Sequence, residues 1–326
     1  MVKRNVKFYI LRAVAIILIF LAHASPPGII FQFRNFDVIL LMLLSGFFSK
    51  HSLENNKNIF LYYKKRILRF IIPVWIFLFI YFIISKIVLN IDFDINEIIS
   101  AFLLGDDFGY IWIFKVYIIT CLISPILYYV YKKIIYKKYL LFLSCLLILN
   151  QIGIWLIGTN NELINWTLFY TIGYGACYGL GFVIDNLKKK DYYYIIFINF
   201  IIFLFLMIYY YKVLGRFVTT NMFKYPPGFY YISYGVFVAF IFLFILNYFN
   251  VKFPKFLSNY FSFIGSHSMW IYLWHIPIVK ILNYYNFDYW ILSFILILIL
   301  SSCFMFLQSF LVKRTNNKNI IKYFDC

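Results

Sequence analysis

The sequence predicts an all-α fold: a polytopic membrane helical bundle of about ten transmembrane helices, with both termini in the cytoplasm. Composition is the first reason, because 64% of the 326 residues are hydrophobic, 13% are charged and the mean hydropathy is +0.84. These values exclude an ordinary soluble domain. The second reason is that the apolar residues fall into runs of ~17 to 25 residues, the length that crosses a bilayer as a helix.

Ten such runs define the predicted spans. They cover residues 8–24, 31–49, 67–89, 109–131, 139–157, 164–184, 192–211, 229–249, 262–282 and 289–312. Residues 313–326 follow as a predicted cytoplasmic tail. Because no connection between the runs is long enough for a folded soluble domain, we expect residues 1–326 to form a single transmembrane domain.

The distribution of positive charge predicts the orientation. A net charge of +18 would suggest a nucleic-acid partner in a soluble protein, but here most of the 30 Lys and Arg residues fall in alternate loops. These basic segments carry Lys3, Arg4 and Lys7; Lys50, Lys57, Lys64, Lys65, Arg66 and Arg69; Lys132, Lys133, Lys137 and Lys138; Lys188, Lys189 and Lys190; Lys252 and Lys255; and Lys313, Arg314, Lys318 and Lys322. By the positive-inside rule these segments are cytoplasmic. We therefore expect contacts with membrane lipids and none with nucleic acid.

The first run contains two ionisable residues, Arg12 and His23. They are 11 positions apart, so on a helix they leave the same face, about 16 Å apart along the axis. An arginine in hydrocarbon costs at least ~2.5 kcal/mol, so such groups normally face a polar interior and mark a pathway or a site. The pair is the first candidate for a functional site.

Two other interpretations of this run stay open. Lys3, Arg4 and Lys7 resemble the basic region of a signal peptide, and Ala22-His23-Ala24 imitates a cleavage site. Arg12 in the apolar core and the many later spans argue against cleavage. Alternatively, Arg12 extends to the cytoplasmic headgroups and His23 reaches the opposite interface.

A second pair, Arg66 and Arg69, precedes the third span. The two residues are three positions apart and project from one side of the helix start. Guanidinium groups pair with phosphate through two hydrogen bonds, so the pair suits a polyanionic ligand. Binding of anionic lipid headgroups, or a plain topology signal, is the competing interpretation.

Further polar groups are expected close to the outer surface. Trp112 reads as an interface anchor, whereas Lys115 lies deeper and requires a partner for its burial. His275 falls in the outer half of its span, at a depth comparable to that of His23. Imidazoles near the outer face and arginines near the inner face imply a polar path across the bilayer.

Other patterns give weaker indications. The outer loop from Asn90 to Tyr110 is acidic, and we favour a solvated loop over a catalytic carboxylate site. Its carboxylates belong to Asp92, Asp94, Glu97, Asp106 and Asp107. Neither the four histidines nor the five cysteines show the spacing of a metal-binding motif, so we expect no metal site.

Taken in chain order, several motifs resemble the acyltransferase 3 family of integral membrane acyltransferases. They are Arg12 with ten residues before His23; Ser45-Gly46-Phe47; Arg66-x-x-Arg69 before Pro73; the stretch from Trp112 through Tyr117 to Pro125; and Ser268 with Tyr272-Leu273-Trp274-His275-x-Pro277. The resemblance covers nearly the whole chain, and the turn Lys224-Tyr225-Pro226-Pro227 resembles a feature of some bacterial polysaccharide-modifying members. This sequence departs from the family at Leu41 and Met42, where many members have paired phenylalanines, and it lacks the carboxylate that some members carry just after Trp112.

The resemblance implies a function and assigns roles. The expected reaction is transfer of an acyl group, usually acetyl from acetyl-CoA, to a hydroxyl of a surface glycan or lipid-linked saccharide at the bacterial cytoplasmic (inner) membrane. It also implies that Arg66 and Arg69 bind the CoA phosphates and that Arg12 and His23 belong to the active centre.

The mechanism that we expect uses neutral His23 as general base on the acceptor hydroxyl, because the ordinary histidine pKa of ~6.5 lies near working pH. A donor for the developing oxyanion is also needed. Trp112, Lys115 and His275 are the candidates, and Tyr272 is a candidate substrate contact. A covalent acyl relay through His23 or a serine stays open.

Two functions from other classes remain as alternatives. The first is a polysaccharide transporter or flippase whose internal cations escort an anionic lipid-linked glycan without acyl transfer. The second is a glycan polymerase, for which we expect a larger external loop than this sequence has.

Overall fold

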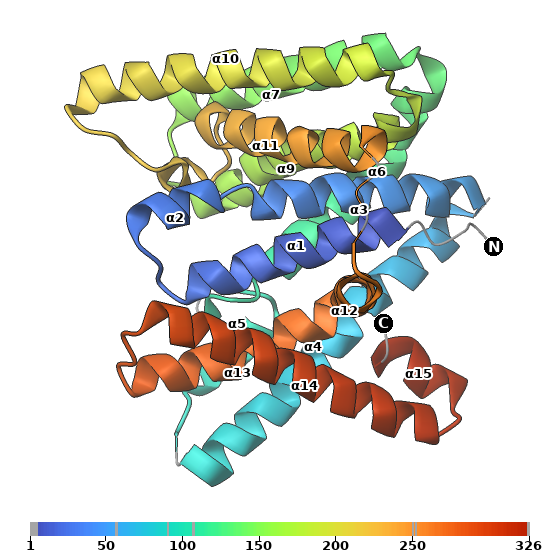
Figure 1. Cartoon of the computed structure of the whole chain (residues 1–326), viewed down its shortest axis with the longest axis vertical. Coiled ribbons are helices and arrows are strands. Elements are labelled where there is room, and N and C mark those ends of the chain that lie inside the picture. The colour runs from blue at the N-terminus through green and yellow to red at the C-terminus, as the bar shows by residue number, and fades with distance from the viewer. Residues whose placement is uncertain are drawn as a thin grey trace.

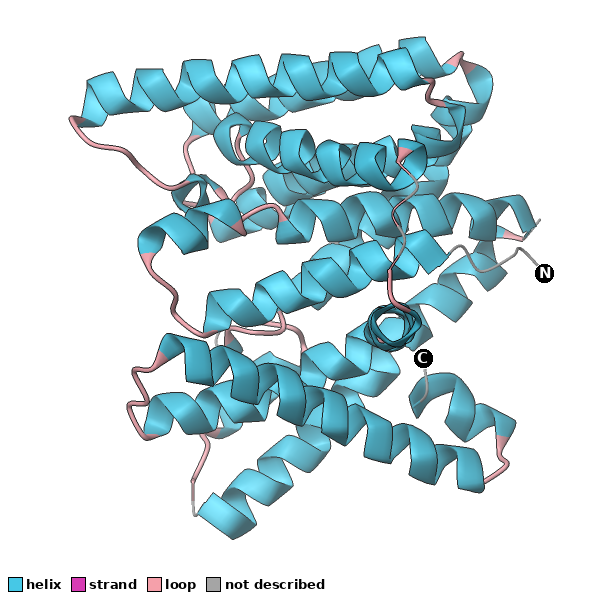
Figure 2. Cartoon of the chain, viewed as in Figure 1, coloured by secondary structure: helices cyan, strands magenta, loops and turns pink. Residues whose placement is uncertain are grey.

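The computed structural model describes residues 6–55, 58–89, 91–105, 108–249, 251 and 253–324. The protein is all-helical, as the sequence predicts, and Figures 1 and 2 show helices joined by short connections. Within the described ranges, nine helical segments are long and apolar enough to cross a membrane. The fold is a polytopic membrane bundle.

The helices follow one another with few long breaks. In chain order they are α1 (Val6–His23), α2 (Gly28–Phe33), α3 (Asp37–Asn55), α4 (Ile59–Leu89), α5 (Ile95–Phe102), α6 (Trp112–Lys133), α7 (Tyr136–Ile157), α8 (Glu162–Ile164), the π-helical turn η2 (Asn165–Tyr170), α9 (Thr171–Val183), the 3-10 turn η3 (Ile184–Asn186), α10 (Lys189–Leu214), the 3-10 turn η4 (Thr220–Phe223), α11 (Phe229–Tyr248), α12 (Lys255–Ser266), α13 (Ser268–Tyr284), α14 (Trp290–Arg314) and α15 (Lys318–Phe324).

The structure differs from the prediction at the ninth run, residues 262–282. This run is two helices, α12 and α13, separated at His267, whose backbone leaves the helical region at φ −108° and ψ 23°. Just before the break, Gly265 lies so close to α1 that a Cβ there would be 2.0 Å from the carbonyl oxygen of Tyr9. The close contact with α1 fixes α12 across the bundle, and α12 is seen nearly end-on in Figure 1.

Helix α13 holds most of the ninth predicted run, the one predicted crossing that has no counterpart among the nine segments found in the described ranges. It has 17 residues, at the short end of the range that spans a bilayer. In Figure 1 it runs from α12 to the left edge of the bundle, and α14 returns beside it. Hydropathy alone does not separate α12 from α13, because both sides of the break are apolar.

The basic connections gather at one end of the bundle. In Figure 1 the N-terminal end of α1, the connections α3–α4, α6–α7, α9–α10 and α11–α12, and the connection α14–α15 lie on the right, which we call the basic end. The connections α1–α2, α10–α11 and α13–α14 lie on the left, the outer end. This arrangement agrees with the predicted orientation. Six charged residues named in the sequence analysis lie outside the described residues: Lys3, Arg4, Lys57, Asp106, Asp107 and Lys252.

Helix α1 lies at the centre of the bundle, where it contacts α3, α12 and α13. Its neighbour α3 is held by α9 at a crossing of glycines. A Cβ at Gly46 would lie 1.8 Å from the carbonyl oxygen of Tyr178, and one at Gly181 would lie 2.1 Å from that of Leu43. The glycine of Ser45-Gly46-Phe47 therefore lets α3 and α9 approach each other closely.

Candidate active site

Arg12 and His23 each line a cavity on one side of α1. His23, the last residue of α1, lines a cavity of about 160 Å³ near the outer end, the outer cavity. Arg12 lines a smaller cavity of about 30 Å³ towards the basic end, the inner cavity. Ile113 of α6 and Tyr272 of α13 line both cavities. The two cavities therefore lie next to each other along α1, and the side chains of Ile113 and Tyr272 separate them.

His23 is surrounded by aromatic rings. The ring of Tyr110 lies edge-on at 5.0 Å and that of His275 lies at 5.2 Å, measured between centroids. His275 is fully buried and stacks on Phe20. The structure thus brings together the two histidines that the sequence placed at comparable depth.

The hydrogen bond of His275 limits its chemistry. Its Nδ1 bonds to the backbone carbonyl of Tyr272, and a carbonyl only accepts, so Nδ1 carries the proton. Nε2 of the neutral ring is then an acceptor, and it is buried without a hydrogen-bond partner among the described residues. His275 in this state accepts a hydrogen bond and does not donate one to an oxyanion.

A buried ionic cluster lines the outer cavity beside His23. Arg34 Nη1 lies 2.5 Å from Asp37 Oδ2, and Lys224 Nζ lies 3.7 Å from Asp37 Oδ1. The exposed fractions of Arg34, Asp37 and Lys224 are 3%, 0% and 4%. Asp37 was not singled out from the sequence. The rule that singled out Arg12 applies equally to this carboxylate, which opens an apolar run.

The connection from α10 to α11 holds Lys224 over the cavity. Asn35 Nδ2 donates to Thr220 Oγ1 at 2.7 Å, and Asn150 Nδ2 donates to the carbonyl of Pro227 at 3.0 Å. Burial lowers the pKa of Lys224 to about 8; the charge of Asp37 opposes this shift and that of Arg34 adds to it. The turn Lys224-Tyr225-Pro226-Pro227, which resembles a feature of some family members, is therefore a fixed wall of the outer cavity.

The structure separates the two candidates at the start of α6. Trp112 lines the outer cavity, with the ring of Tyr225 edge-on at 4.9 Å and Lys224 Nζ 5.5 Å from its centroid. Lys115 Nζ instead lies 3.8 Å from the ring centroid of Trp166 and is not among the residues that line the outer cavity. Trp112 is part of the site wall, and Lys115 is turned towards a different neighbour.

The arginines meet near the inner cavity. Arg12 lies over the ring of Phe48 at 5.6 Å, while Arg66 Nη2 donates to the carbonyl of Phe48 at 3.1 Å. Arg12 also lies within electrostatic range of both Arg66 and Arg69. Its Nε is buried and has no hydrogen-bond partner in the described part of the chain. Three guanidinium groups thus converge between the basic end and the inner cavity.

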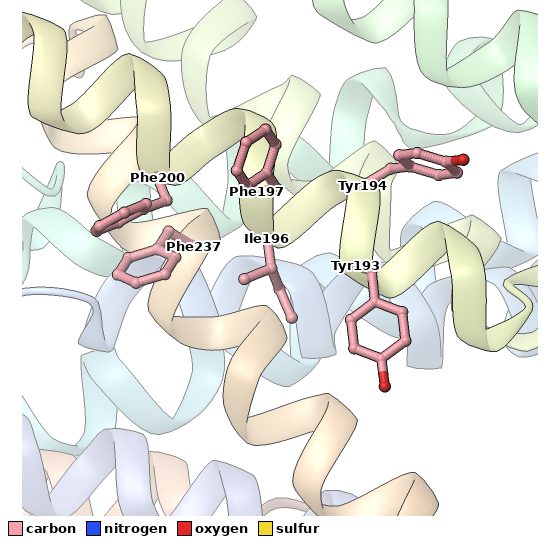
Figure 3. A pocket seen from close by; sticks show the side chains of 6 residues that line it. All are labelled: Tyr193, Tyr194, Ile196, Phe197, Phe200 and Phe237. Atoms are coloured by element: carbon pink, nitrogen blue, oxygen red, sulfur yellow. The ribbon is translucent and has the colours of Figure 1, made fainter.

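A larger and more open cavity lies elsewhere, between α10 and α11. It measures about 490 Å³ and is lined by Tyr193, Tyr194, Ile196, Phe197, Phe200 and Phe237 (Figure 3). No charged side chain lines it, and the hydroxyls of Tyr193 and Tyr194 point away from the phenylalanine rings. This cavity suits contact with apolar lipid chains, whereas the groups able to move protons line the outer cavity.

The described residues contain no group of three or more His, Cys, Asp or Glu side chains placed to hold a metal ion. The polar side chains that line the outer cavity include the nitrogen groups of His23, Arg34, Trp112 and Lys224 and the carboxylate of Asp37. Such a set suits proton transfer and the binding of polar or anionic substrates.

Residues 5–314 match the sequence model of the acyltransferase 3 family, which is described as an acyltransferase domain. Comparisons with curated proteins and with solved structures gave no match. The family match spans nearly the whole chain. The chain therefore belongs to the acyltransferase 3 family and is a multi-pass membrane acyltransferase.

Proposed function

We propose that the protein is an O-acetyltransferase of the bacterial inner membrane that moves an acetyl group from cytoplasmic acetyl-CoA to a hydroxyl of a surface glycan or lipid-linked saccharide. One observation carries the proposal: Arg12 and His23 line two cavities on the same face of α1, and these cavities meet at Ile113 and Tyr272. A donor entering from the basic end and an acceptor entering from the outer end would meet at this division.

The arginines support a donor site at the basic end. Arg66 and Arg69 are suited to the CoA phosphates, because the guanidinium fork pairs with two phosphate oxygens at once. Arg12 extends this set of donors into the bundle, where its buried Nε has no partner among the described groups. The acyl arm then enters past Arg12 towards His23.

His23 acts as the general base. One ring nitrogen takes the proton of the acceptor hydroxyl while the hydroxyl oxygen attacks the thioester carbonyl carbon. The resulting tetrahedral centre collapses, the carbon–sulfur bond breaks, and the leaving CoA thiolate takes the proton from His23, which returns to its neutral form. The ester remains on the acceptor, so every atom of the two substrates is accounted for.

His275 positions the base. With its own proton on Nδ1, its Nε2 is available to accept the N–H of the neighbouring His23 ring, 5.2 Å away between centroids. Such a bond fixes which nitrogen of His23 faces the acceptor, as the orienting member of a catalytic triad does. Trp112, whose side chain lines the same cavity, is the candidate donor to the oxyanion.

Mass spectrometry of the surface glycan tests the proposal. Glycan from cells that make the protein should carry the mass increment of an acetyl group, and glycan from cells that lack it should not. Cells that make His23→Ala should resemble the cells without the protein while the variant is still inserted in the membrane. A change in the amount of exported glycan with no acetyl increment in any strain contradicts the proposal and favours the transporter alternative.

A further inference from the structure

The ionic cluster at the outer cavity contains charges that the acyl-transfer step does not use. Arg34 and Lys224 supply two positive charges and Asp37 supplies one negative charge, and all three side chains are buried. Among the described residues that line this cavity, Asp37 is the only carboxylate. Burial of a charge without a partner is costly, so the cavity has one positive charge that a ligand can neutralise.

The geometry of Arg34 leaves donors for that ligand. Its Nη1 is paired with Asp37, and its guanidinium lies 3.9 Å from the ring centroid of Phe31, which fixes the plane of the group. Nε of Arg34 is buried and has no hydrogen-bond partner in the described ranges. An oriented guanidinium with an unused buried donor is suited to a carboxylate or phosphate.

The remaining wall suits a sugar. Trp112 and Tyr225 present aromatic rings beside Lys224, and His23 lies in the same cavity. The volume of about 160 Å³ is below the ~300 to 1,000 Å³ of sites that enclose whole drug-sized ligands, so the cavity accepts one end of a larger molecule. The outer cavity therefore combines positive charge, aromatic rings and the proposed base His23 in a space that fits one small polar group of a larger molecule.

We propose that the outer cavity selects an acidic acceptor, in which Arg34 and Lys224 bind a carboxylate or phosphate group on, or next to, the sugar whose hydroxyl His23 deprotonates. This inference rests on the proposed function, since it names the class of acceptor. Arg34 and Lys224 are binding residues in this account, and Asp37 lies between the two cations and pairs with both.

Ligand-induced thermal stabilisation of the full-length protein in detergent tests the inference without requiring activity. The probes are sodium glucuronate for the carboxylate, inorganic phosphate for the phosphate, and glucose as the neutral sugar, all at ionic strength matched with chloride. A ligand that binds only the folded state raises the melting temperature, and at equal concentration a tighter ligand raises it more. We expect one or both anions to stabilise the wild-type protein and glucose to have little effect.

The variant Lys224→Met should weaken binding of the effective anion about tenfold or more, the loss of one hydrogen bond to a charged group. This variant keeps the Arg34–Asp37 pair. Lys212→Met, at the exposed C-terminal end of α10, removes a positive charge on the same side of the molecule and should bind as the wild type does. Stabilisation by phosphate alone identifies a phosphate-bearing acceptor, and stabilisation by glucuronate alone identifies an acidic sugar.

Several outcomes would overturn the inference. The first is that neither anion raises the melting temperature of the wild-type protein. The second is that glucose raises it as much as the anions do. The third is that the wild type and Lys224→Met bind the anion with equal affinity. Should Lys224→Met not fold, the comparison of anions with glucose in the wild type still decides. The same measurements in His23→Ala separate the two proposals, because this variant should still bind the anion when it no longer transfers the acyl group. Conversely, transfer to a neutral glycan by a wild-type protein that binds no anion would support the proposed function and contradict the acidic acceptor.

Discussion

At the scale of single residues, His23 owes its proposed role to its neighbours. The same imidazole at a lipid-facing position would have no partner to select its tautomer, but here His275 lies against it with an unpartnered, buried acceptor nitrogen. Because Nδ1 of His275 bonds to the Tyr272 carbonyl, the orientation of the pair is set by the backbone of α13. The pair is therefore the first place to test the mechanism.

We expect His275→Phe to lower kcat about hundredfold or more, within the range of effects attributed to acid–base groups, with little change in KM for the acceptor. The phenyl ring keeps the stacking on Phe20 but has no acceptor for the N–H of His23. Steady-state kinetics measure the change. His275→Gln supplies a carbonyl oxygen near the Nε2 position and should recover part of the rate, and equal rates for the two variants would argue against a positioning role.

Lys224 gives a prediction for pH. Burial lowers its pKa to about 8, and the charges facing it belong to Asp37 on α3 and Arg34 just before α3. The titratable side chains of His23 on α1 and Tyr225 line the same cavity. Only the protonated amine attracts an anion. Affinity for the effective anion should therefore be constant below this pKa and fall as the pH rises through it, with a midpoint moved upwards by the bound anion.

Thermal stabilisation measured across the pH range checks this prediction. In Lys224→Arg the guanidinium keeps its charge throughout, so the loss of affinity above pH of about 8 should disappear. A fall of the same size in Lys224→Arg would assign the pH dependence to another group.

At the scale of helices, glycines decide how closely the site is held. The backbone of α3, which carries Asp37, meets α9 at Gly46 and Gly181, where no side chain separates the helices. Small residues at such crossings let membrane helices pack through their backbones. The Ser-Gly-Phe motif of the family resemblance thus has a packing role in this chain, some distance from the reacting groups.

Gly46→Ala should destabilise the fold by about 1 to 3 kcal/mol, the cost of overpacking a tight contact. The added Cβ would lie 1.8 Å from a backbone oxygen of α9, which is not free to move aside. The melting temperature in detergent measures the effect. Gly28→Ala is the matched control, since a Cβ there has no atom within 4 Å, and equal melting temperatures for the two variants would contradict the packing argument.

Helix α13 contributes the side chain that divides the two cavities. Tyr272 lines both of them and donates a hydrogen bond to the carbonyl of Tyr110 at 2.5 Å. Removing the ring joins the cavities and admits water to the thioester. We expect Tyr272→Ala to raise the ratio of acetyl-CoA hydrolysis to transfer, measured as CoA release with and without acceptor.

Tyr272→Phe is the control for this prediction, because it keeps the ring and loses the bond to Tyr110. It should hydrolyse acetyl-CoA at close to the wild-type ratio. If Tyr272→Ala shows no excess hydrolysis, the division between the cavities is formed by other side chains.

At the scale of the whole molecule, the sequence predicted what depends on short-range pattern. Hydropathy predicted the long apolar helices, and the alternation of basic loops agrees with the grouping of the connections at the two ends of the bundle. The separation of 11 residues predicted that Arg12 and His23 share one face of α1. The break at His267 was not predictable from hydropathy, because it depends on the contact between Gly265 and Tyr9 across two helices.

The ionic cluster was missed for a similar reason. Asp37 and Lys224 are far apart in the sequence, and each alone reads as a charge near the end of a span. Only packing of the α10–α11 connection against α3 makes them neighbours and buries them beside His23. Likewise, nothing local to Lys115 reveals that its amine lies over Trp166 and away from the outer cavity.

The central claim is that His23 transfers the proton in acyl transfer between the two ends of the bundle. The most direct measurement uses the purified protein in proteoliposomes, with labelled acetyl-CoA on the side of the basic end and the acceptor glycan on the other side, and compares the wild type with His23→Ala. We predict that label reaches the glycan only with the wild type, while both proteins bind CoA equally well. Transfer by His23→Ala at the wild-type rate would contradict the account.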